Sequence, residues 1–276
     1  MPPIPVGIVT SKGLQAAPYT AQSLAEAATK EPPGVYTLAR TYNRTGALLL
    51  DEHLDRLERS AQLTGIPLHL DRSSLRAALR TLIEQSGYAE SRFRITIPHD
   101  DPQQPILSLE PYKPVPPEVI AHGARVVTLH LERHNPVAKS TEWADKRRAA
   151  VEAFPPGTYE GILVSAEGQL LEGTSSNFYA ILHGILRTAT DQSVLGGIAR
   201  RIVLTVAPSI LPVQTQAIQQ DAIGKLDETF LTSSGRGVVP IVEIDGVKIA
   251  SGEPGTLTRR LRDAYDQWAA AHVEPI

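Results

Sequence analysis

The sequence contains no cysteine, and this absence excludes several kinds of chemistry at once. Disulfide frameworks, thiolate metal sites and cysteine nucleophiles all require a thiol, whereas the redox compartment stays undetermined. The eight histidines are scattered, with His130 and His134 as the one pair at i,i+4, and no carboxylate cluster accompanies them. Because metal sites gather such ligands at short spacings, we expect no metal.

Other absences narrow the function further. No apolar run approaches the length that crosses a membrane. The net charge is −3, and Lys and Arg are mixed with Asp and Glu, so no basic face for a nucleic acid is expected. The start MPPIPVGIVT is unlike a signal peptide, which makes the cytoplasm the expected location. The nucleophile elbow of Ser-His-Asp hydrolases, the phosphate-binding P-loop and the dinucleotide fingerprint are all missing.

What is present indicates a globular chain of 276 residues, with 42% hydrophobic residues and no internal repeat. Residues 34–113 spell strand, strand, helix, helix, strand, strand, which is typical of a compact α+β domain with an antiparallel sheet. The prolines of YKPVPPEV mark a linker. We therefore predict a small N-terminal domain over 1–113, a linker over 114–121 and a large C-terminal domain over 122–276. Residues 1–33 are expected to form a surface-packed arm.

Periodicity and turn residues place the individual elements. Strands are predicted at 35–42, 47–51, 91–98, 105–112, 124–132, 212–218, 227–234, 238–244 and 247–250, and helices at 21–30, 51–65, 73–88, 197–207, 221–226 and 256–271. A further helix is expected after Lys139, with Thr141 as its cap. Tight hairpins are expected at His183-Gly184 and Asp245-Gly246.

The stretch from Tyr159 to Arg200 is where the chemistry is expected. It reads as a strand, a turn, a second strand that carries Glu172, a hairpin, and a helix opened by Gly196-Gly197. A helix N-terminus preceded by glycines is suited to binding an anion. Glu172 follows two leucines and precedes small polar residues. A charge at the edge of a strand is the ordinary interpretation of such a glutamate.

Once other chemistries are excluded, several candidate groups remain. They are a lysine, a glutamate, a helix start suited to an anion, and the hydroxyls of Thr232, Ser233 and Ser234. A reactive lysine, a carboxylate for a pyridinium proton and an anion cup are the parts that a pyridoxal phosphate enzyme needs. Lys139 stands before a helix, where a lysine is commonly just solvated. Lys146 is the rival lysine, but DKRR reads as a solvent-facing stretch.

From about Gly34 to the C-terminus the chain resembles the class IV, or fold-type IV, pyridoxal phosphate enzymes. LLEGTSSNFYAI, ILRT, LGGIAR, DETFLTSS, VVPIVEIDG and PGTLTRRL stand in the family's order and spacing. The resemblance implies a two-domain α+β fold like that of D-amino-acid aminotransferases, whose larger C-terminal domain has mixed sheets in a pseudo-barrel. It also implies a homodimer, with pyridoxal 5'-phosphate bound between the domains.

The resemblance also implies roles for single residues. Lys139 would form the Schiff base and move the proton, and Glu172 would pair with the pyridine nitrogen. Arg56, in HLDRL, would contact the phosphate, although it can also be read as an i,i+4 partner of Glu52. Further cofactor contacts are expected from Leu195, Gly197, Ile198, Ala199, Ser233 and Ser234. Many relatives carry Thr at the position of Ala199, so more of the phosphate binding would rest on the backbone.

Recognition of the substrate is the least typical feature. The Arg-Gly pair that captures the carboxylate in D-amino-acid enzymes is replaced here by Ile97-Pro98. We expect Arg40 and Arg236 to substitute, because a guanidinium fork suits a carboxylate. Tyr36 and the backbone of Gly235 would line the same site, although a strand tyrosine is as readily a packing residue.

The leading hypothesis is an aminotransferase that moves an amino group between an amino acid and a 2-oxo acid, of the branched-chain or D-amino-acid type. The alternative is a lyase of the aminodeoxychorismate type, which would use the same lysine and release pyruvate. A third hypothesis is a pyridoxal phosphate-binding protein without catalysis. The stereochemistry of the substrate stays open.

Overall fold

The chain folds as two compact units in a computed structural model that describes residues 2–276. Unit 1 consists of the chain up to Lys113 together with Ala138–Lys146 and His272–Ile276. Unit 2 consists of Pro114–Val137 and Arg147–Ala271. Two short segments that are distant in the sequence are thus built into the first unit, and one of them carries Lys139.

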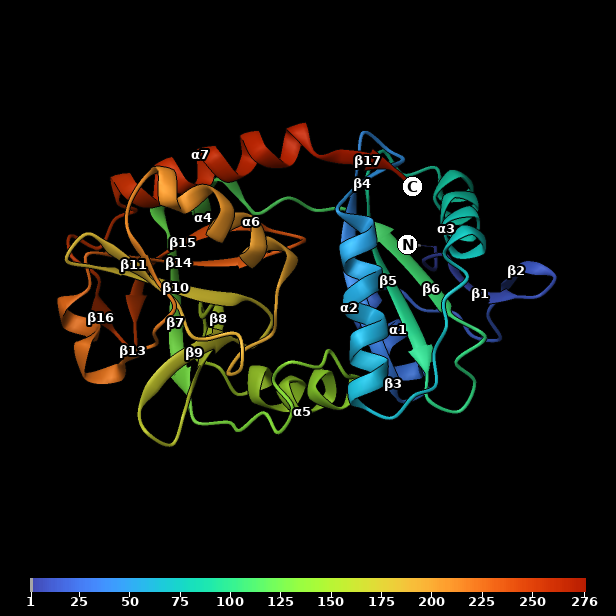
Figure 1. Cartoon of the computed structure of the whole chain (residues 1–276), viewed down its shortest axis with the longest axis horizontal. Coiled ribbons are helices and arrows are strands. Elements are labelled where there is room, and N and C mark those ends of the chain that lie inside the picture. Colours follow the sequence, from blue (N-terminus) through green and yellow to red (C-terminus); the bar gives the residue numbers. More distant parts are fainter. Residues whose placement is uncertain (1) are drawn as a thin grey trace. The chain divides into compact units, whose positions relative to one another are not determined.

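Unit 1 is organised around a seven-stranded antiparallel sheet of order β17-β4-β3-β5-β6-β1-β2 (Figure 1). Its strands are β1 (Val6–Thr10), β2 (Gly13–Ala16), β3 (Gly34–Tyr42), β4 (Gly46–Leu48), β5 (Ser91–Pro98), β6 (Ile106–Pro111) and β17 (Val273–Pro275). Alternation of side chains along β3 and β5 assigns their residues to two faces. One face is apolar and the other carries charged and hydroxyl groups.

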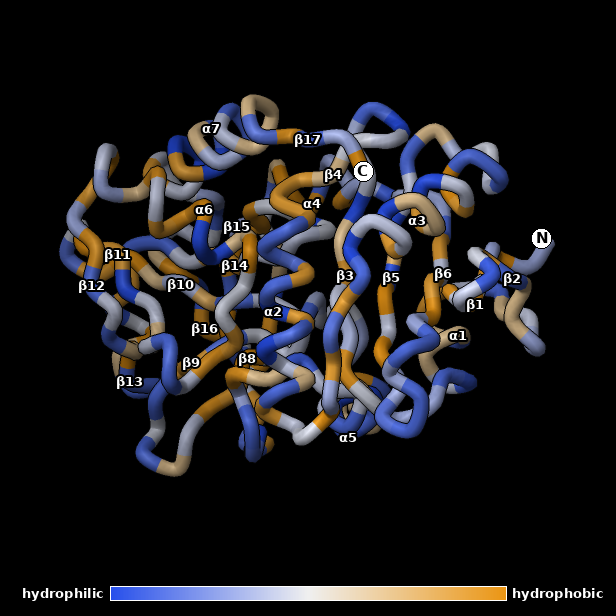
Figure 2. Tube along the Cα trace, turned by 45° about the vertical axis from the view of Figure 1, so that its right-hand side comes forward, coloured by the Kyte–Doolittle hydropathy of each residue, from blue (hydrophilic) through white to orange (hydrophobic). Residues whose placement is uncertain are grey.

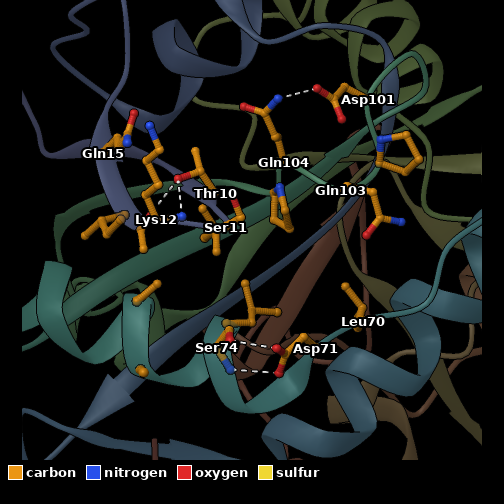
Figure 3. A pocket seen from close by; sticks show the side chains of 18 of the residues that line it. Thr10, Ser11, Lys12, Gln15, Leu70, Asp71, Ser74, Asp101, Gln103 and Gln104 are labelled. Atoms are coloured by element: carbon orange, nitrogen blue, oxygen red, sulfur yellow. Dashed lines mark hydrogen bonds between the residues drawn. The ribbon is translucent and has the colours of Figure 1, made fainter.

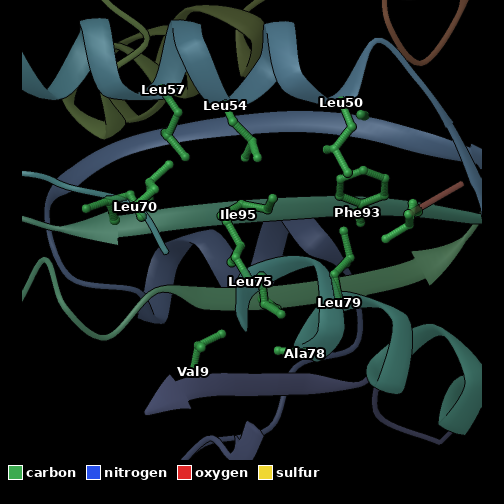
Figure 4. Packing of buried hydrophobic residues seen from close by; sticks show 14 of the residues in the cluster. Val9, Leu50, Leu54, Leu57, Leu70, Leu75, Ala78, Leu79, Phe93 and Ile95 are labelled. Atoms are coloured by element: carbon green, nitrogen blue, oxygen red, sulfur yellow. The ribbon is translucent and has the colours of Figure 1, made fainter. Parts of the chain in front are cut away.

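The apolar face is covered by α2 (Leu50–Leu63) and α3 (Arg72–Ser86). Figure 4 shows the leucines at one face of α2 lying against Phe93 and Ile95 of β5, with Leu79 of α3 completing the cluster. Each fully buried leucine or phenylalanine contributes about 1.5–3 kcal/mol. The hydrophobic residues along β5 and β6 appear as orange segments in Figure 2. The apolar residues that recur along one face of α2 and of α3 therefore form the core of this unit.

The opposite face of the same sheet has a smaller apolar cover. Helix α1 (Leu24–Lys30) places Leu24 and Ala27 in a cluster against which Leu38 of β3 packs. Ser23 caps this helix by accepting a hydrogen bond from the Glu26 N–H at 3.1 Å. Since Leu38 lies on this face, its alternate neighbours Tyr36 and Arg40 share it.

Unit 2 is organised around a ten-stranded sheet in which β10, β14, β15, β7, β8 and β9 form a closed ring. Its strands are β7 (Ala124–Leu129), β8 (Glu160–Val164), β9 (Gln169–Gly173), β10 (Asn177–Leu182), β11 (Ile185–Arg187), β12 (Val213–Gln214), β13 (Ile218–Gln219), β14 (Glu228–Ser233), β15 (Gly237–Ile244) and β16 (Val247–Lys248). The pairs β15–β7 and β7–β8 are parallel, and the other pairs in the ring are antiparallel. Glu172 opposite Asn177 is the pair that closes it.

The helices of this part of the chain are α4 (Pro117–His122), α6 (Ile198–Val206) and α7 (Thr256–Ala271), with 3-10 turns at Ala207–Ser209 and Gln220–Lys225. Helix α5 (Thr141–Glu152) begins in unit 1 and ends in unit 2. An antiparallel sheet in one unit and a mixed, barrel-forming sheet in the other confirm the predicted α+β fold class.

Both predicted hairpin turns are confirmed. His183 and Gly184 have φ of 53° and 71°, and Asp245 and Gly246 have φ of 51° and 78°. Two successive residues with positive φ are the mark of a type I′ turn, whose twist matches that of the strands it joins. The turns therefore set the register of β10 with β11 and of β15 with β16.

Several local predictions were wrong. Residues 1–33 are not only an arm, because β1 and β2 extend the sheet of unit 1. The second strand of the first hairpin ends at Leu48, because Leu49 is left-handed with φ of 51° and α2 starts at Leu50. Residues 212–218 contain the whole of β12 and the first residue of β13, which are two separate strands rather than one. C-terminal β17 had no signal in the sequence because it is only three residues long.

The predicted cap of α5 was also wrong. Thr141 lies inside the helix, and its hydroxyl accepts a hydrogen bond from the Gly34 N–H at 2.9 Å. The Ser140 hydroxyl instead accepts from the Trp143 N–H at 3.5 Å. Thr141 thus fastens the segment to β3 rather than the helix to itself. Among residues 2–276, no helix is long and apolar enough to cross a bilayer.

Candidate active site

Lys139 is held against the edge of β3 by its own backbone. Its carbonyl accepts from the Tyr36 N–H at 3.0 Å, and its N–H donates to the Ser60 hydroxyl of α2 at 3.1 Å. Ser140 forms a bridge with Val35. The side chain is half-buried, and its Nζ lies 4.9 Å from the centre of the Tyr36 ring. Lys146, the rival lysine, is exposed on α5.

Arg56 lies in the same unit, next to a buried histidine. Its Nη2 donates to the Thr37 hydroxyl at 3.1 Å and lies 3.4 Å from His53 Nδ1, which itself is 2.8 Å from Thr37 Oγ1. Burial, followed by the charges of Arg56 and Lys139, holds the pKa of His53 well below its ordinary value. His53 is therefore neutral, and it and Thr37 fix the guanidinium of Arg56. Neither His53 nor Thr37 was predicted from the sequence as a site residue, although His53 is the first residue of the HLDRL motif.

In unit 2, Glu172 is a buried carboxylate that accepts from N–H donors. Its Oε1 pairs with Arg133 Nη1 at 2.5 Å, and its Oε2 accepts from the Leu195 N–H at 3.1 Å. The Asn177 amide donates to the Leu195 carbonyl at 2.9 Å, so the Leu195 backbone is held at both ends. A buried carboxylate that already receives a cationic N–H donor is suited to a protonated pyridine nitrogen. Arg133 had no signal in the sequence.

The helix start predicted at Gly196-Gly197 is present, because Gly197 caps α6 without any side-chain hydrogen bond. A Cβ at Gly197 would lie 2.1 Å from Asn177 Oδ1, whereas one at Gly196 would have nothing within 4 Å. The backbone at Gly197 is thus packed closely on the Asn177 side chain. Ile198 and Ala199 are buried in the first turn. Uncapped N–H groups at the start of a helix of this length are suited to a phosphate.

Arg200 anchors this helix start, which sequence reasoning missed. Its guanidinium donates to the Thr188 hydroxyl at 2.6 Å, to the Ala189 carbonyl at 2.7 Å and to Asp191 at 2.9 Å. The side chain is 2% exposed. A buried arginine with every edge engaged fixes the loop before α6 and therefore the direction of the N–H groups at its start.

The loop after β14 is fastened by Arg236. This guanidinium donates to Glu160 Oε2 at 2.6 Å, to the Ser233 hydroxyl at 2.9 Å and to the Ser175 hydroxyl at 2.9 Å. Ser233 and Ser234 are half-buried, and Gly235 is buried. Arg236 therefore joins the loop that carries these residues to the turn that follows Glu172.

Arg40, the other arginine expected at the substrate, lies on β3 among aromatic rings. Its guanidinium carbon is 4.0 Å from the centre of the Tyr42 ring and 4.3 Å from that of Tyr112, and Nη1 is 3.5 Å from Glu90. These contacts are all within unit 1. Arg40 and Arg236 are thus both committed to other protein groups.

Among the predicted site residues, unit 1 brings together Lys139, Tyr36 and Arg56. Unit 2 groups Glu172 with Leu195 and, through Asn177, with Gly197, and it separately groups Ser233 with Arg236. Within residues 2–276, no group of three or more His, Asp or Glu side chains is placed to hold a metal ion.

A hollow of about 940 Å³ in unit 1 lies apart from these residues. Figure 3 shows it between the β1–β2 hairpin, the start of α3 and the loop near Asp101. Its lining is mixed polar and apolar, with Lys12, Asp71 and Gln104 among the side chains that reach it. None of the predicted site residues lines this hollow.

Comparison with known proteins identifies the family. Residues 34–244 match the model of the amino-transferase class IV family, so the chain belongs to that family. The chain is 29% identical over 250 residues to a D-alanine aminotransferase of Bacillus licheniformis, covering 84% of this chain and 86% of that protein. It is 25% identical over 262 residues to a branched-chain-amino-acid aminotransferase of Pseudomonas aeruginosa, covering 87% and 85%.

The fold is shared with solved structures. A branched-chain aminotransferase of Thermoproteus uzoniensis superposes with a TM-score of 0.81 at 21% identity, covering 99% of each chain. The protein is therefore an aminotransferase that uses pyridoxal phosphate and acts on an amino acid and a 2-oxo acid. The relatives are transaminases, so the lyase alternative is not favoured.

Proposed function

We propose that transamination by this chain depends on Lys139 as the covalent and proton-transferring residue and on Glu172 as the partner of the pyridine nitrogen. The observation that carries the proposal is the environment of Glu172, a buried carboxylate that accepts N–H donors at both of its oxygens. Pyridoxal phosphate, when bound, supplies an aldehyde carbon and a ring that takes up electrons. The residues of the chain hold that ring and move one proton.

The amine of Lys139 is suited to both of its tasks. Its backbone is fixed by Tyr36 and Ser60, while the side chain stays half-buried above the Tyr36 ring. A fixed backbone and a long side chain suit one lysine to bond covalently at rest and then to take the proton from the substrate α-carbon. The aromatic ring limits the directions that the amine can take.

The carboxylate of Glu172 holds a proton on the pyridine nitrogen by pairing with it. Water is largely excluded there, since the Glu172 side chain is 4% exposed. An ion pair in such surroundings would be stronger than in water, so Glu172 would keep the nitrogen of a bound pyridine ring protonated. Leu195, whose N–H donates to this carboxylate, is proposed to pack on the ring.

The phosphate is proposed to bind the guanidinium of Arg56 and the uncapped backbone at the start of α6. Arg56 is oriented by Thr37 and His53, and the helix start by Arg200. Further contacts are proposed from Gly197, Ile198, Ala199, Ser233 and Ser234. Helix starts and arginine forks are both common phosphate binders.

The amino donor is proposed to be a branched-chain or a D-amino acid, as the names of the relatives suggest. Holoenzyme is mixed with single L- and D-amino acids, and loss of the absorption band of the bound cofactor is followed. A response to a branched-chain L-amino acid or to a D-amino acid supports the proposal. If no amino donor reacts but pyruvate is released from aminodeoxychorismate, the lyase hypothesis is supported instead. If neither reaction occurs, the hypothesis of a cofactor-binding protein without catalysis is supported.

The role of Lys139 is tested by chemical trapping. Borohydride treatment of the holoenzyme, followed by peptide mass spectrometry, is expected to place the cofactor mass on Lys139. The matched control is Lys146→Ala, which is expected to keep the label on Lys139 because Lys146 is exposed. A label on another lysine in the unaltered protein would contradict the assignment.

Three expectations from the sequence stay predictions. They are the domain boundaries at 1–113, 114–121 and 122–276, the homodimer, and the cytoplasmic location. Sedimentation of the purified protein tests the second, with a mass of twice 29.9 kDa as the expected result. A monomer that retains full activity would contradict it.

A further inference from the structure

Ser60 is a buried serine near the end of α2, and its hydroxyl contacts two backbone groups. It donates to the Arg56 carbonyl at 2.8 Å and accepts from the Lys139 N–H at 3.1 Å. The residue is 1% exposed, and all three residues belong to unit 1. One side chain thus joins the backbone of the proposed phosphate arginine to the backbone of the proposed reactive lysine.

The chemistry of these groups fixes the direction of both hydrogen bonds. A backbone carbonyl only accepts and a backbone N–H only donates, whereas a serine hydroxyl has one hydrogen and two lone pairs. The hydrogen of the Ser60 hydroxyl is therefore used on Arg56, and a lone pair receives the N–H of Lys139. A hydroxyl that already donates is a better acceptor, because successive hydrogen bonds polarise one another.

The bond from Ser60 to Arg56 has an ordinary local explanation. Hydroxyls on helices often donate to the carbonyl four residues earlier, and the Thr64 hydroxyl does so toward the Ser60 carbonyl at 2.9 Å. The bond from Lys139 has no such local origin, because it joins α2 to a segment that lies 79 residues farther along the chain. Ser60 therefore differs from Thr64 because it also holds a second part of the chain.

The segment that carries Lys139 is fastened on two sides. On one side the Tyr36 N–H donates to the Lys139 carbonyl at 3.0 Å. The Gly34 N–H also donates to the Thr141 hydroxyl at 2.9 Å, so the segment follows β3. On the other side Ser60 holds the segment to α2. Because the two bonds of Lys139 use the N–H and the C=O that flank its Cα, they fix the starting point of its side chain.

We propose that Ser60 is a positioning residue that sets the distance between the backbone of Lys139 and the helix that carries Arg56. This inference rests on the proposed function, in which Lys139 bonds to the cofactor and Arg56 binds its phosphate. A ligand that is held at both ends fits a narrow range of separations between its two anchors, so the anchors themselves have to be fixed by neighbouring hydrogen bonds. One hydroxyl bonded to both backbones maintains that separation.

The test compares two forms of the cofactor that differ in their bond to the lysine. Pyridoxal phosphate has the aldehyde that bonds to a lysine amine, whereas pyridoxamine phosphate has an amine in its place and forms no such bond. Full-length protein loaded with either form is dialysed to equilibrium, and free and bound cofactor give the two dissociation constants. Their ratio separates the contribution of Lys139 from that of the phosphate and pyridine contacts.

Ser60→Ala is expected to raise the dissociation constant of pyridoxal phosphate by roughly tenfold or more, and that of pyridoxamine phosphate by less than about threefold. The reason is that the segment of Lys139, once released from α2, has to be brought back into position before its amine bonds to the aldehyde. Thr64→Val is the matched control, because it removes a hydroxyl of the same helix that bonds to the carbonyls of Ser60 and Ala61. It is expected to change either constant by less than about twofold.

Equal losses for the two cofactor forms in Ser60→Ala would overturn the proposal, because they are expected if Ser60 only stabilises α2 or only orients Arg56. Unchanged constants for both forms would also overturn it. Ser60→Cys keeps the shape of the side chain but forms weaker hydrogen bonds, so it is expected to raise the ratio by less than Ser60→Ala does. If Ser60→Ala does not fold, the ratio in Ser60→Cys decides between the same outcomes.

Borohydride trapping separates this inference from the proposed function. If the unaltered protein carries the label on Lys139 and the Ser60 variants leave the ratio of the two constants unchanged, only the inference fails. If the unaltered protein carries no label on Lys139, the proposed function fails, and the inference fails with it.

Discussion

Arg236 Nη1 donates to Glu160 Oε2 at 2.6 Å, and this pair joins the loop after β14 to the first residue of β8. Glu160 also accepts from the Ser175 N–H at 2.6 Å and from the Ser176 hydroxyl at 3.0 Å. Burial alone would raise the pKa of Glu160, but the guanidinium and these hydrogen bonds outweigh it and hold the pKa below its ordinary value. Glu160 is therefore an anion that depends on Arg236.

Arg236→Met is expected to destabilise the protein by about 3 kcal/mol, because it leaves a buried carboxylate without its cation. Urea unfolding followed by circular dichroism measures the loss. The double variant Glu160→Gln with Arg236→Met is expected to lose less, since no charge is left buried. Equal stability of the single variant and the unaltered protein would show that the pair is not needed.

Gly197→Ala is expected to lower stability by roughly 1–3 kcal/mol and to weaken cofactor binding, because its Cβ would lie 2.1 Å from Asn177 Oδ1. Movement of Asn177 would release the Leu195 carbonyl that it holds. Gly196→Ala is the matched control, since its Cβ has nothing within 4 Å. Thermal unfolding with and without cofactor compares the two variants. Similar losses in both would contradict the close packing at Gly197.

The lowered pKa of His53 predicts that the free energy of unfolding depends on pH. Its pKa in the folded protein is well below the ordinary value of about 6.5, so below that pH the unfolded chain binds a proton that the folded chain does not. Its contribution to stability is complete above about pH 6.5, and it falls with decreasing pH by about 1.4 kcal/mol per pH unit until the folded pKa is reached. His53→Asn is expected to flatten this slope. If the unfolding free energies of the unaltered protein and of His53→Asn changed in parallel between about pH 7 and pH 5, this role of His53 would be refuted.

Glu172→Gln is expected to slow the half-reaction by roughly 100-fold or more, because a neutral amide does not hold a proton on the pyridine nitrogen. Single-turnover absorbance with a saturating amino donor measures the rate, and the cofactor content of the variant is measured separately. Glu172→Asp is the control that keeps the charge but shortens the side chain, and it is expected to retain more of the rate. An unaltered rate in the Gln variant would assign the pyridine partner elsewhere.

The sequence predicted the elements that depend on short-range pattern. The apolar periods of α2, α3 and α7 and the hairpins at Gly184 and Gly246 were placed correctly, because side-chain spacing and positive φ are local properties. The ordered motifs around Glu172 also identified the family. β1, β2 and β17 were missed because each is short, and β1 and β17 are also stabilised by neighbouring strands that are distant in the sequence.

Partners far apart in the sequence were decided only by the tertiary structure. Lys139 is fixed by Tyr36 and Ser60, and Glu172 pairs with Arg133 and Leu195, yet no spacing rule relates these residues. The same holds for the arginines. Residues 40, 94 and 236 are all arginines, so the sequence does not tell their roles apart. Only the burial and the hydrogen-bond partners of Arg40, Arg94 and Arg236 distinguish them.

The sequence by itself thus determined the family, the fold class and the types of group needed for the chemistry, because these are encoded in motif order and local pattern. The tertiary structure alone decided which charges are already neutralised. Glu160 engages Arg236, the rings of Tyr42 and Tyr112 enclose Arg40, and Glu31 leaves one edge of Arg94 without a partner in the described chain. The physical reason is that a charge acts through its distance to other charges and its exposure to water, and folding sets both.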